Sequence, residues 1–524
     1  MPKVHDYTKM FDLTKIGVAN HAKNTPDKPA LIMGDRVITY KEMDELTNAM
    51  GHVLIDMGIR QGDRLCIQVY NSPEMPLFTA AAGKAACIPI SLNYRFKADE
   101  LAYVVNNSGS SLLIYGQEFE EVVDQARAEL ENKDLKFIRL GGKSDDMAPE
   151  LYDLMAKVPT TPPEQQTDGS GVAASIIYTS GTTGRPKGVF RKPKNRLNSI
   201  LGYAYNFDAE PDDVSLAAGP LYHSAPYAWC TYGVAIGNTV VIMPRFDAEE
   251  FLKTVEKHKA VSTFIVPTMA NRIVNLPDQV KNKYDISSLK RITVAAEVFP
   301  FPLKKKTIEF FGEGKIYEFY GATESGITTI IRPEDQLRKP GSCGKASFGN
   351  DIKLFDEKFN EVSQGEVGIF YSKSDFLLDE YYNNPEATAA AYHGDYFTVG
   401  DMAYVDEDGF YYIVDRAVDM VISGGINIYP AEIEEVLYTH PAVFDAGIIG
   451  ARDPDWGEKL IAFVTKKEGA ELTEEDVINY VGEKMAGYKK PKEVYFVEEL
   501  PYLPSGKMLK RVLKEEYKKM HPEE

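Results

Sequence analysis

Short apolar segments alternate with amphipathic helical segments along most of this chain, and this alternation limits the folds that it can adopt. Segments with the length and apolar content of buried strands occur at residues 65–70, 87–90, 175–178, 263–266, 291–295 and 315–319. Helical segments follow Pro73 and cover residues 251–258. The alternation predicts a layered α/β architecture. Functional loops in such folds lie at the carboxyl ends of strands, so we expect loops from different strands to face one crevice.

The end of the chain has a different character, with short elements in quick succession. Pro430 suits the first turn of a helix, and Thr473 with Asp476 has the spacing of a capping box. The 524 residues also exceed the usual size of one hydrophobic core. We therefore predict a large N-terminal layered α/β domain over residues 1–415 and a small α+β domain over residues 416–524.

The charge of the chain excludes some classes of partner. The formal net charge is −19, whereas nucleic acids and anionic membranes select basic surfaces. An anionic substrate must then be met by local cations, for which Lys187, Arg185, Arg416 and Lys507 are the candidates. We expect no nucleic-acid partner.

The cysteines and the hydropathy pattern indicate the cellular compartment in which the protein would be found. Cys66, Cys87, Cys230 and Cys343 are widely spaced and form no metal or disulfide pattern, which fits a reducing compartment. The chain shows neither a signal peptide nor an apolar stretch long enough to span a bilayer. We expect a cytoplasmic protein without an integral membrane segment. Peripheral contact with membranes and the oligomeric state stay open, with a homodimer as one alternative.

A loop rich in glycine and hydroxyl residues follows the apolar segment 173–177. Residues 178–188 read YTSGTTGRPKG. Gly181, Gly184 and Gly188 allow the backbone N–H groups to approach an anion closely, and Lys187 adds positive charge. The Walker pattern GxxxxGK[ST] is not met, which argues against a kinase or GTPase. The loop predicts a polyphosphate site.

This loop and five further motifs resemble the adenylate-forming superfamily, which contains acyl-CoA synthetases, luciferases and the adenylation domains of peptide synthetases. The further motifs, in the order of that family, are residues 320–325 (YGATES), 400–401 (GD), 415–416 (DR), 423–425 (SGG) and 504–507 (PSGK). The resemblance covers almost the whole chain. It implies an N-terminal AMP-binding domain and a small, mobile C-terminal lid domain.

The resemblance assigns the nucleotide site. It implies that the phosphate loop holds the β and γ phosphates of ATP, that Thr323 contacts phosphate, and that Glu324 binds Mg²⁺ with Thr179 beside it. Adenine is expected to stack on Tyr320, next to Gly321, with Ala295, Ala296 and Glu297 on the other side of the base. Asp401 and Arg416 are expected to bind the ribose hydroxyls. The phosphate-loop residues assigned in this way are Thr179, Ser180, Gly181, Thr182, Thr183, Gly184 and Lys187.

Several residues depart from the family pattern. Ala295 and Glu297 stand where relatives usually carry glycine-rich sequence, so a simple turn at the end of the strand is an alternative for Glu297. Val399 replaces a threonine before Gly400. Val418 stands at the hinge position, where Asp or Lys is usual, and its β-branched side chain restricts the backbone.

The small domain is expected to supply groups to both half-reactions of the family. Lys507 is the predicted catalytic cation, since an ammonium neutralises charge on the α-phosphate and the attacking carboxylate. By resemblance, Ser423, Gly424 and Gly425 line the passage for the pantetheine arm of CoA. Because both groups act at one acyl-phosphate centre, the domain must rotate between the two steps. Lys510 and Arg511 are interpreted as surface charges.

The acyl pocket is the least determined part of the site. By resemblance, His223 occupies the position at the mouth of the acyl pocket, where it would gate the entrance or orient the carboxylate, although a lone histidine is often structural. Tyr227, Trp229 and Tyr232 would line the pocket with Gly321, or would only pack the core.

These features predict an acid–thiol ligase that uses ATP, Mg²⁺ and CoA. A hydrophobic carboxylic acid, of medium chain length, aromatic or alicyclic, would be converted to an acyl-adenylate with release of pyrophosphate and then to the CoA thioester with release of AMP. The alternatives are an enzyme that loads the phosphopantetheine of a carrier protein, a non-catalytic nucleotide-binding relative, and a light-emitting oxidative relative.

Overall fold

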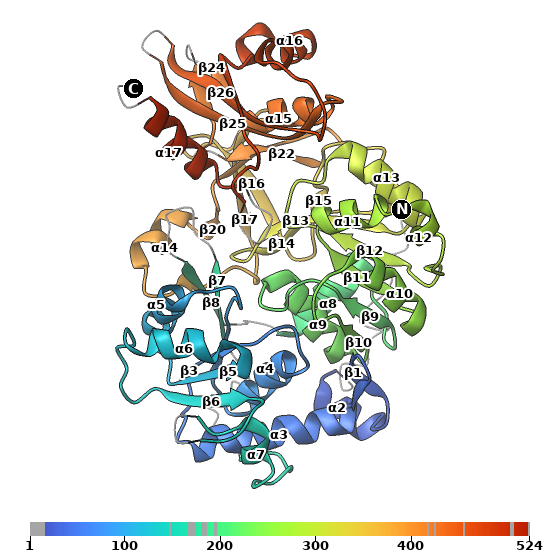
Figure 1. The fold of residues 1–524 in the computed structure, drawn as a ribbon, viewed down its shortest axis with the longest axis vertical. Coiled ribbons are helices and arrows are strands. Elements are labelled where there is room, and N and C mark those ends of the chain that lie inside the picture. The colour runs from blue at the N-terminus through green and yellow to red at the C-terminus, as the bar shows by residue number, and fades with distance from the viewer. Residues whose placement is uncertain are drawn as a thin grey trace.

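The computed structural model describes residues 16–145, 148–164, 174–179, 186–192, 196–416, 419–423, 426–453, 456–502 and 508–521. The strands of these residues form five sheets. Figure 1 shows a large lower part, which contains most of the chain, and a small domain at the top that is built from the C-terminal residues.

The largest sheet has nine strands in the order β15-β14-β13-β12-β11-β9-β10-β1-β2. Its central strands are parallel, and β2, β14 and β15 add antiparallel edges. Runs of β-branched residues such as TVVI in β10 suit these buried strands. The strands are β1 (Pro29–Met33), β2 (Arg36–Thr39), β9 (Val214–Ala217), β10 (Thr239–Ile242), β11 (Ser262–Ile265), β12 (Arg291–Val294), β13 (Ile316–Ala322), β14 (Gly326–Ile331) and β15 (Lys345–Ala346).

Helices connect and cover this sheet, as crossover connections between parallel strands require. Asp247 accepts hydrogen bonds from two backbone N–H groups at the start of α10, so its side chain sets where that helix begins. The helices are α8 (Arg196–Phe207), α9 (Ser224–Ile236), α10 (Ala248–His258), α11 (Pro267–Val274), α12 (Asp278–Lys281) and α13 (Phe301–Phe311), followed by the 3-10 turn η3 (Pro333–Asp335).

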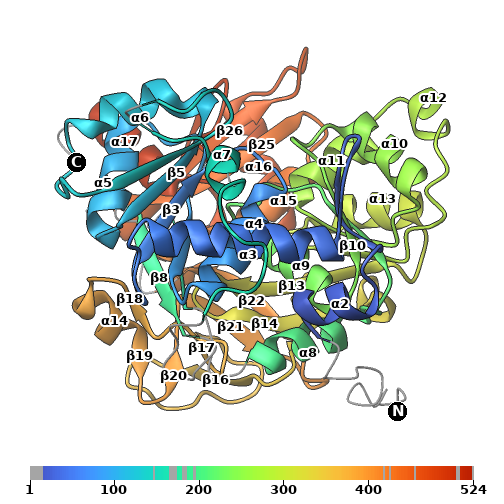
Figure 2. The same ribbon diagram turned by 90° about the horizontal axis from the view of Figure 1, so that it is seen from below.

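A second lobe contains a parallel sheet in the order β4-β3-β5-β6 and, beside it, the three-stranded sheet β18-β8-β7. Helix α3 (Tyr40–Asp56) begins with a capping box between Thr39 and Glu42 and runs across both lobes in Figure 2. The strands are β3 (Arg64–Gln68), β4 (Ile88–Ser91), β5 (Leu112–Gly116), β6 (Lys136–Leu140), β7 (Ser175–Thr179), β8 (Lys187–Arg191) and β18 (Glu380–Tyr381). The other helices are α2 (Val18–Asn24), α4 (Glu74–Lys84), α5 (Ala98–Ser108), η2 (Gln117–Phe119), α6 (Glu120–Arg127) and α7 (Leu151–Met155).

A six-stranded sheet joins these lobes to the small domain. It has the order β19-β20-β17-β21-β22, with β16 paired to β17. The elements are β16 (Asp351–Phe355), β17 (Gly368–Lys373), α14 (Pro385–Ala391), β19 (Tyr392–His393), β20 (Tyr396–Phe397), β21 (Asp401–Val405) and β22 (Tyr411–Arg416). Since β22 ends at Arg416 and the next strand belongs to another sheet, the chain changes sheet close to the predicted domain boundary. The exact division at residues 415 and 416 stays a prediction.

The small domain packs helices on a five-stranded sheet in the order β24-β23-β26-β25, with β27 paired to β26. Helix α15 begins at Pro430, and α16 begins after Thr473 with the capping box to Asp476, as the sequence predicted. The elements are β23 (Val421–Ser423), β24 (Ile426–Ile428), α15 (Pro430–Tyr438), β25 (Val443–Asp453), β26 (Gly457–Lys466), α16 (Glu474–Lys484), η4 (Gly487–Lys489), β27 (Glu493–Phe496) and α17 (Lys510–Met520).

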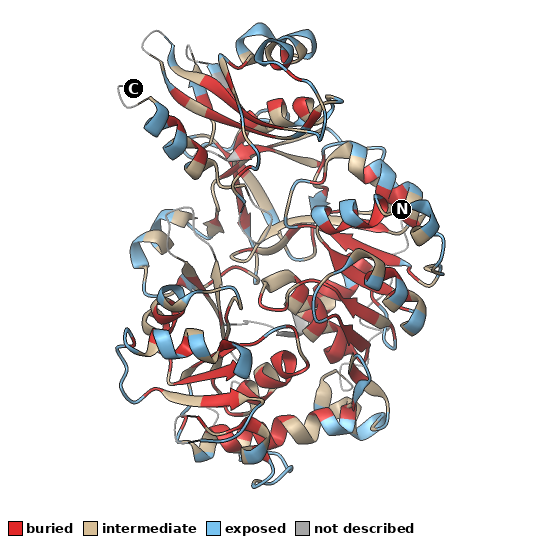
Figure 3. Ribbon diagram, viewed as in Figure 1, coloured by how far each residue is buried: buried red, intermediate tan, exposed pale blue. Residues whose placement is uncertain are grey.

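The buried residues are distributed over the sheets of the large part and of the small domain. Figure 3 shows buried residues along the strands of each sheet and exposed residues on the outer faces of helices such as α16 and α17. The small domain has its own core, which includes Ile433, Leu437, Ile448 and Val477. The predicted α/β fold with a large and a small domain is confirmed. Within the described residues, no helix is both long enough and apolar enough to cross a membrane.

The interpretation of Lys510 as a surface charge is wrong. Its ammonium lies 2.9 Å from the Glu434 carboxylate, and both side chains are only 12% exposed. The same carboxylate accepts the backbone N–H of Ile448 at 2.7 Å. Lys510 is therefore part of a buried ion pair that ties α17 to α15, and buried charges of this kind need such partners.

Candidate active site

A cavity of about 1900 Å³ lies where loops from several sheets meet. Residues at or just beyond the carboxyl ends of β9, β11, β12 and β13 line it, together with parts of α8 and α9 and the start of α15. Thr179 and Lys187, the described residues on either side of the phosphate loop, line the same cavity as residues 320–324. The ends of the phosphate loop and residues 320–324 therefore face one cavity, as the sequence predicted.

The expected adenine and ribose residues contact each other. The hydroxyl of Tyr320 donates to the carboxylate of Asp401 at 2.5 Å, and Asp401 is buried. Asp401 is also paired with Arg416 across β21 and β22, so the two predicted ribose residues are neighbours. At Gly321 an added Cβ would lie 1.9 Å from the carbonyl oxygen of Gly326, so no other residue fits there without a backbone shift. This arrangement places a flat ring beside hydrogen-bonding groups suited to a nucleoside.

Polar groups continue from there toward the phosphate loop. The hydroxyl of Tyr381 donates to Glu324 at 3.2 Å, and the ammonium of Lys187 lies 5.2 Å from the centre of the Tyr381 ring. The hydroxyls of Ser224 and Thr323 are 3.0 Å apart. Thr179 donates weakly to the carbonyl of Lys187 at 3.5 Å. A cation, a carboxylate and several hydroxyls therefore share one wall of the cavity.

The oxygen donors suit Mg²⁺ held mainly by substrate phosphates. No cluster of three or more His, Cys, Asp or Glu side chains able to hold a metal occurs among the described residues. Mg²⁺ commonly binds one or two protein oxygens and completes its shell with phosphate and water. Glu324 and the Thr179 hydroxyl are donors of the right kind for such a site.

The segment predicted to contact the other side of the adenine, residues 295–297, has an unusual backbone. Ala296 adopts φ of 80°, a left-handed conformation that favours glycine, which gives a physical reason for glycine in this segment of related enzymes. Next to it, Glu297 lines the cavity, and its Oε1 is buried and has no hydrogen-bond partner among the described residues. Burial raises the pKa of this carboxyl to about 7. Glu297 therefore faces the cavity, and its part in binding the adenine stays a prediction beside the alternative of a simple turn.

We expect Glu297→Gln to stabilise the protein increasingly as pH rises from 4.5 to about 7. The unfolded carboxyl ionises first, so the folded state binds the extra proton and loses stability as pH rises through this window. Glutamine cannot ionise, and its advantage should level off above pH 7 at no more than about 3 to 4 kcal/mol. Thermal melts of both proteins from pH 5 to 8 measure the difference; a pH-independent difference would contradict this account.

His223 is held neutral. It is the N-cap residue of α9, and its Nε2 is buried with no hydrogen-bond partner among the described residues. Burial, with repulsion from Arg95, lowers the pKa of His223 to about 4. The side chain therefore carries no charge near neutral pH, which fits a steric or hydrogen-bonding role better than attraction of a carboxylate.

Aromatic residues form the apolar wall of the cavity. Trp229 stacks on Phe319 with ring centres 5.7 Å apart and contacts Tyr203 edge-on at 5.3 Å. Tyr227 and Tyr232 line the cavity with Trp229. Trp229 is also buried in a cluster with Phe264, so pocket lining and core packing are combined in one residue. Such a wall suits an apolar substrate.

Several predicted residues are not placed in the cavity. Ser423 lies in β23 of the small domain, paired with Ile426 and Gly457, and is not among the described residues that line the cavity. Ala295 is buried in the core cluster that contains Trp229 and is likewise not among the described residues that line the cavity. The predictions that lie outside the described residues are Ser180, Gly181, Thr182, Thr183, Gly184, Arg185, Val418, Gly424, Gly425 and Lys507.

Sequence reasoning missed Tyr381 and Arg191. Both line the cavity, and Tyr381 contacts Glu324 from β18, which is far from it in sequence. For Arg191 a signal existed, because Lys187, Val189 and Arg191 alternate along a strand and so share one face.

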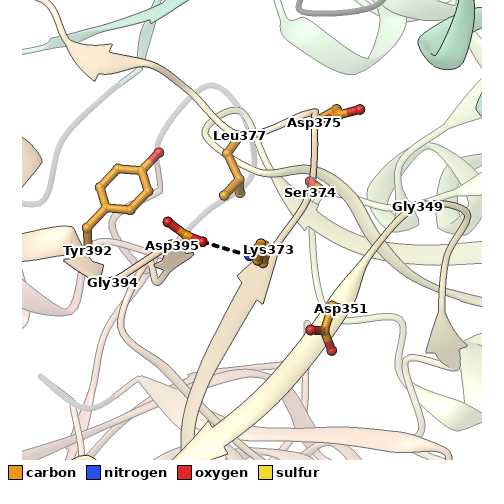
Figure 4. A pocket seen from close by; sticks show the side chains of 9 residues that line it. All are labelled: Gly349, Asp351, Lys373, Ser374, Asp375, Leu377, Tyr392, Gly394 and Asp395. Atoms are coloured by element: carbon orange, nitrogen blue, oxygen red, sulfur yellow. Dashed lines mark hydrogen bonds and ion pairs between the residues drawn. The ribbon is translucent and has the colours of Figure 1, made fainter.

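A smaller cavity of about 500 Å³ lies beside β16 and β17 (Figure 4). Its lining is polar, but Lys373 is paired with Asp395 at 2.7 Å and Asp351 accepts the Tyr396 hydroxyl at 2.5 Å. These charges are satisfied within the protein, and none of the predicted site residues lines this cavity.

Comparison with known proteins identifies the family. The family model of AMP-binding enzymes matches residues 18–382, and that of the AMP-binding enzyme C-terminal domain matches residues 432–507. The chain is 34% identical over 487 residues to the long-chain-fatty-acid–CoA ligase FadD13 of Mycobacterium tuberculosis, covering 92% of this chain and 93% of the relative. It is 30% identical over 501 residues to a 2-succinylbenzoate–CoA ligase of Bacillus cereus, covering 94% and 96%.

Solved structures agree with these matches. An o-succinylbenzoate CoA synthetase from Bacillus subtilis, in complex with its acyl-adenylate intermediate, aligns with a TM-score of 0.83 at 28% identity, covering 95% of this chain and 97% of that one. A fatty acyl CoA synthetase of Mycobacterium tuberculosis aligns with a TM-score of 0.76 at 31% identity, covering 96% and 98%. The resemblance to the acyl-CoA synthetase branch is confirmed, and the chain belongs to the AMP-binding enzyme family.

Proposed function

We propose that the protein is an ATP-dependent acyl-CoA synthetase that activates a hydrophobic carboxylic acid, of medium chain length, aromatic or alicyclic. The acid is joined to AMP with release of pyrophosphate, and CoA then displaces AMP to form the thioester. The observation that supports this most strongly is the sharing of one cavity by the Tyr320–Asp401 pair, the Thr323–Glu324 segment and the aromatic wall around Trp229. A nucleotide and an apolar acid would meet there.

The first half-reaction is a displacement at phosphorus, so the protein acts mainly by positioning and electrostatics. Tyr320 stacks the adenine, while Asp401 and Arg416 hold the ribose. Lys187 and the glycine-rich loop bind the phosphates, and Thr323 contacts them as well. Mg²⁺, which Glu324 and Thr179 would hold, neutralises phosphate charge. Lys507 brings a further positive charge to the α-phosphate.

The second half-reaction needs no nucleophile from the protein, because the acyl-adenylate is already activated. We assign Ser423, Gly424 and Gly425 to the passage for the CoA thiol. Since Ser423 lies in the small domain, outside the described lining of the cavity, this step requires a rotation of that domain.

The other functions considered have less support. The relatives named above are CoA ligases, which disfavours an enzyme that loads a carrier protein. The retained Glu324 and Asp401 disfavour a non-catalytic nucleotide-binding protein. The cytoplasmic location and a homodimeric assembly stay predictions.

A panel of acids tests the proposal. Purified protein with ATP, Mg²⁺ and CoA should release pyrophosphate and AMP with octanoate, benzoate or cyclohexanecarboxylate and give the corresponding thioester. Turnover only with a phosphopantetheinylated carrier, or light emission with oxygen in place of CoA, would replace this function with one of the alternatives.

We expect Val418→Pro to separate the two half-reactions. Proline fixes φ near −65°, so a hinge at this position would lose the backbone freedom that rotation requires. Adenylate formation should persist, and transfer to CoA should fall by at least about tenfold, as for a blocked conformational step. Single-turnover assays of both steps, with a substitution of the nearby and exposed Ile422, Ile422→Ala, as the control, measure this. Wild-type rates for both steps would place the hinge elsewhere.

A further inference from the structure

Arg191 is the last residue of β8 and faces the same side of the strand as Lys187. Side chains alternate along a strand, so residues 187, 189 and 191 share one face, and the two cations start about 13 Å apart. Both line the main cavity. The strand therefore presents a second cation to the cavity, at some distance from the phosphate loop.

The contacts of Arg191 leave its charge without a direct counter-charge. One terminal nitrogen donates to the carbonyl oxygen of Thr323 at 2.6 Å. The Nε is buried without a partner, and no carboxylate of the described residues lies within ion-pairing distance. Glu324 and Asp379 attract the guanidinium only from farther away, and burial lowers the pKa of Arg191. An arginine nevertheless stays charged in proteins, and a buried charge without a partner is costly.

The surroundings indicate what would supply that partner. Arg191 donates to Thr323, on the phosphate side, and lines the same cavity as Tyr232 of the aromatic wall. Tyr232 stands eight residues after Ser224 on α9, about 12 Å along the helix axis. An acid that reaches from the α-phosphate into the aromatic pocket would pass the guanidinium.

We propose that Arg191 binds a carboxylate of the acid substrate inside the cavity. A guanidinium with a free Nε–H matches the planar, two-oxygen geometry of a carboxylate. The carboxylate is either the one that is activated or a second one carried by a dicarboxylic acid. This assignment rests on the proposed function, and it adds to that function a residue that selects and orients the acid.

Kinetics of Arg191→Gln and Arg191→Lys test the assignment, with octanoate and octanedioate as substrates. The control is Lys192→Gln, which removes the adjacent, exposed lysine just beyond the end of β8. Arg191→Gln should raise the KM for the acid about 10- to 100-fold, as expected when a charge-assisted hydrogen bond is lost, and change the KM for ATP less than about twofold. Arg191→Lys should recover part of the loss, and Lys192→Gln should resemble the wild type.

The two acids distinguish the sources of the carboxylate. An equal loss for both identifies the activated carboxylate, whereas a loss for octanedioate alone identifies a second one. The assignment is overturned if the KM for both acids is unchanged. It is also overturned if the KM for ATP rises as much as the KM for the acid. Should the variants not fold, the binding of octanoate and of octanamide to the wild-type protein is compared by competition. Octanoate should bind at least about tenfold more tightly than octanamide, and equal binding overturns the assignment. Failure of the proposed function is a separate result, in which the wild type releases no pyrophosphate with any acid.

Discussion

Replacing Lys507 by alanine is expected to abolish adenylate formation while leaving thioester formation from pre-made acyl-adenylate largely intact. The ammonium is assigned to the charge that builds on the α-phosphate and on the attacking carboxylate, so it matters only in the first step. Loss of one such electrostatic contact in a cavity shielded from water slows the step by about 100- to 1000-fold. Single-turnover assays, with ATP and acid in one and with acyl-adenylate and CoA in the other, separate the two steps.

The control for this experiment is Lys518→Ala, which removes an exposed lysine from α17 of the same domain. It should leave both steps unchanged. Lys510 is unsuitable as a control, because its ion pair with Glu434 is buried and its removal would destabilise the domain. Equal loss of both steps in Lys507→Ala would contradict the role proposed for Lys507.

Asp401→Ala is expected to raise the KM for ATP by about 100-fold. This is the effect expected when two hydrogen bonds from the ribose to a charged carboxylate are lost. The variant removes the carboxylate assigned to the ribose hydroxyls and also the acceptor of the Tyr320 hydroxyl, so the stacking ring loses a group that orients it. The KM for the acid should change much less. Titration with ATP in a calorimeter measures the same loss without turnover.

Two further variants test whether the loss of ATP binding is specific to the carboxylate of Asp401. Tyr320→Phe keeps the ring and loses the hydrogen bond to Asp401, so its effect on ATP binding should be smaller than that of Asp401→Ala. Asp395→Ala removes an exposed aspartate that pairs with Lys373 at the smaller cavity and should leave ATP binding unchanged. Wild-type affinity for ATP in Asp401→Ala would remove the ribose assignment.

Local sequence patterns predicted helices and strands well where neighbouring residues determine where an element begins and ends. The strand predicted at residues 65–70 is β3 (Arg64–Gln68), and the helix predicted from Thr473 has its capping box with Asp476. Both depend on neighbouring residues alone. The nucleotide residues came from motifs, and the structure adds the Tyr320–Asp401 contact, which no single motif contains.

The failures involve contacts between residues distant in the chain. Lys510 looked like a surface charge because nothing near it in sequence indicates Glu434, which α17 meets only after Leu513 and Tyr517 pack onto the small domain. Arg191 was missed although it alternates with Lys187 along β8, and its contact with Thr323 comes from another element. The burial of the Glu297 carboxylate was likewise not predicted, because it depends on how the elements around the cavity pack.

Detection of an enzyme-bound acyl-adenylate tests the central claim most directly. Purified protein is incubated with ATP, Mg²⁺ and each acid without CoA, quenched, and analysed by mass spectrometry. The account predicts acyl-AMP and pyrophosphate in equal amounts, near one per active site, and conversion of the acyl-AMP to thioester and AMP when CoA is added. Formation of thioester with ADP and phosphate, or no acyl-AMP with any acid, would contradict it.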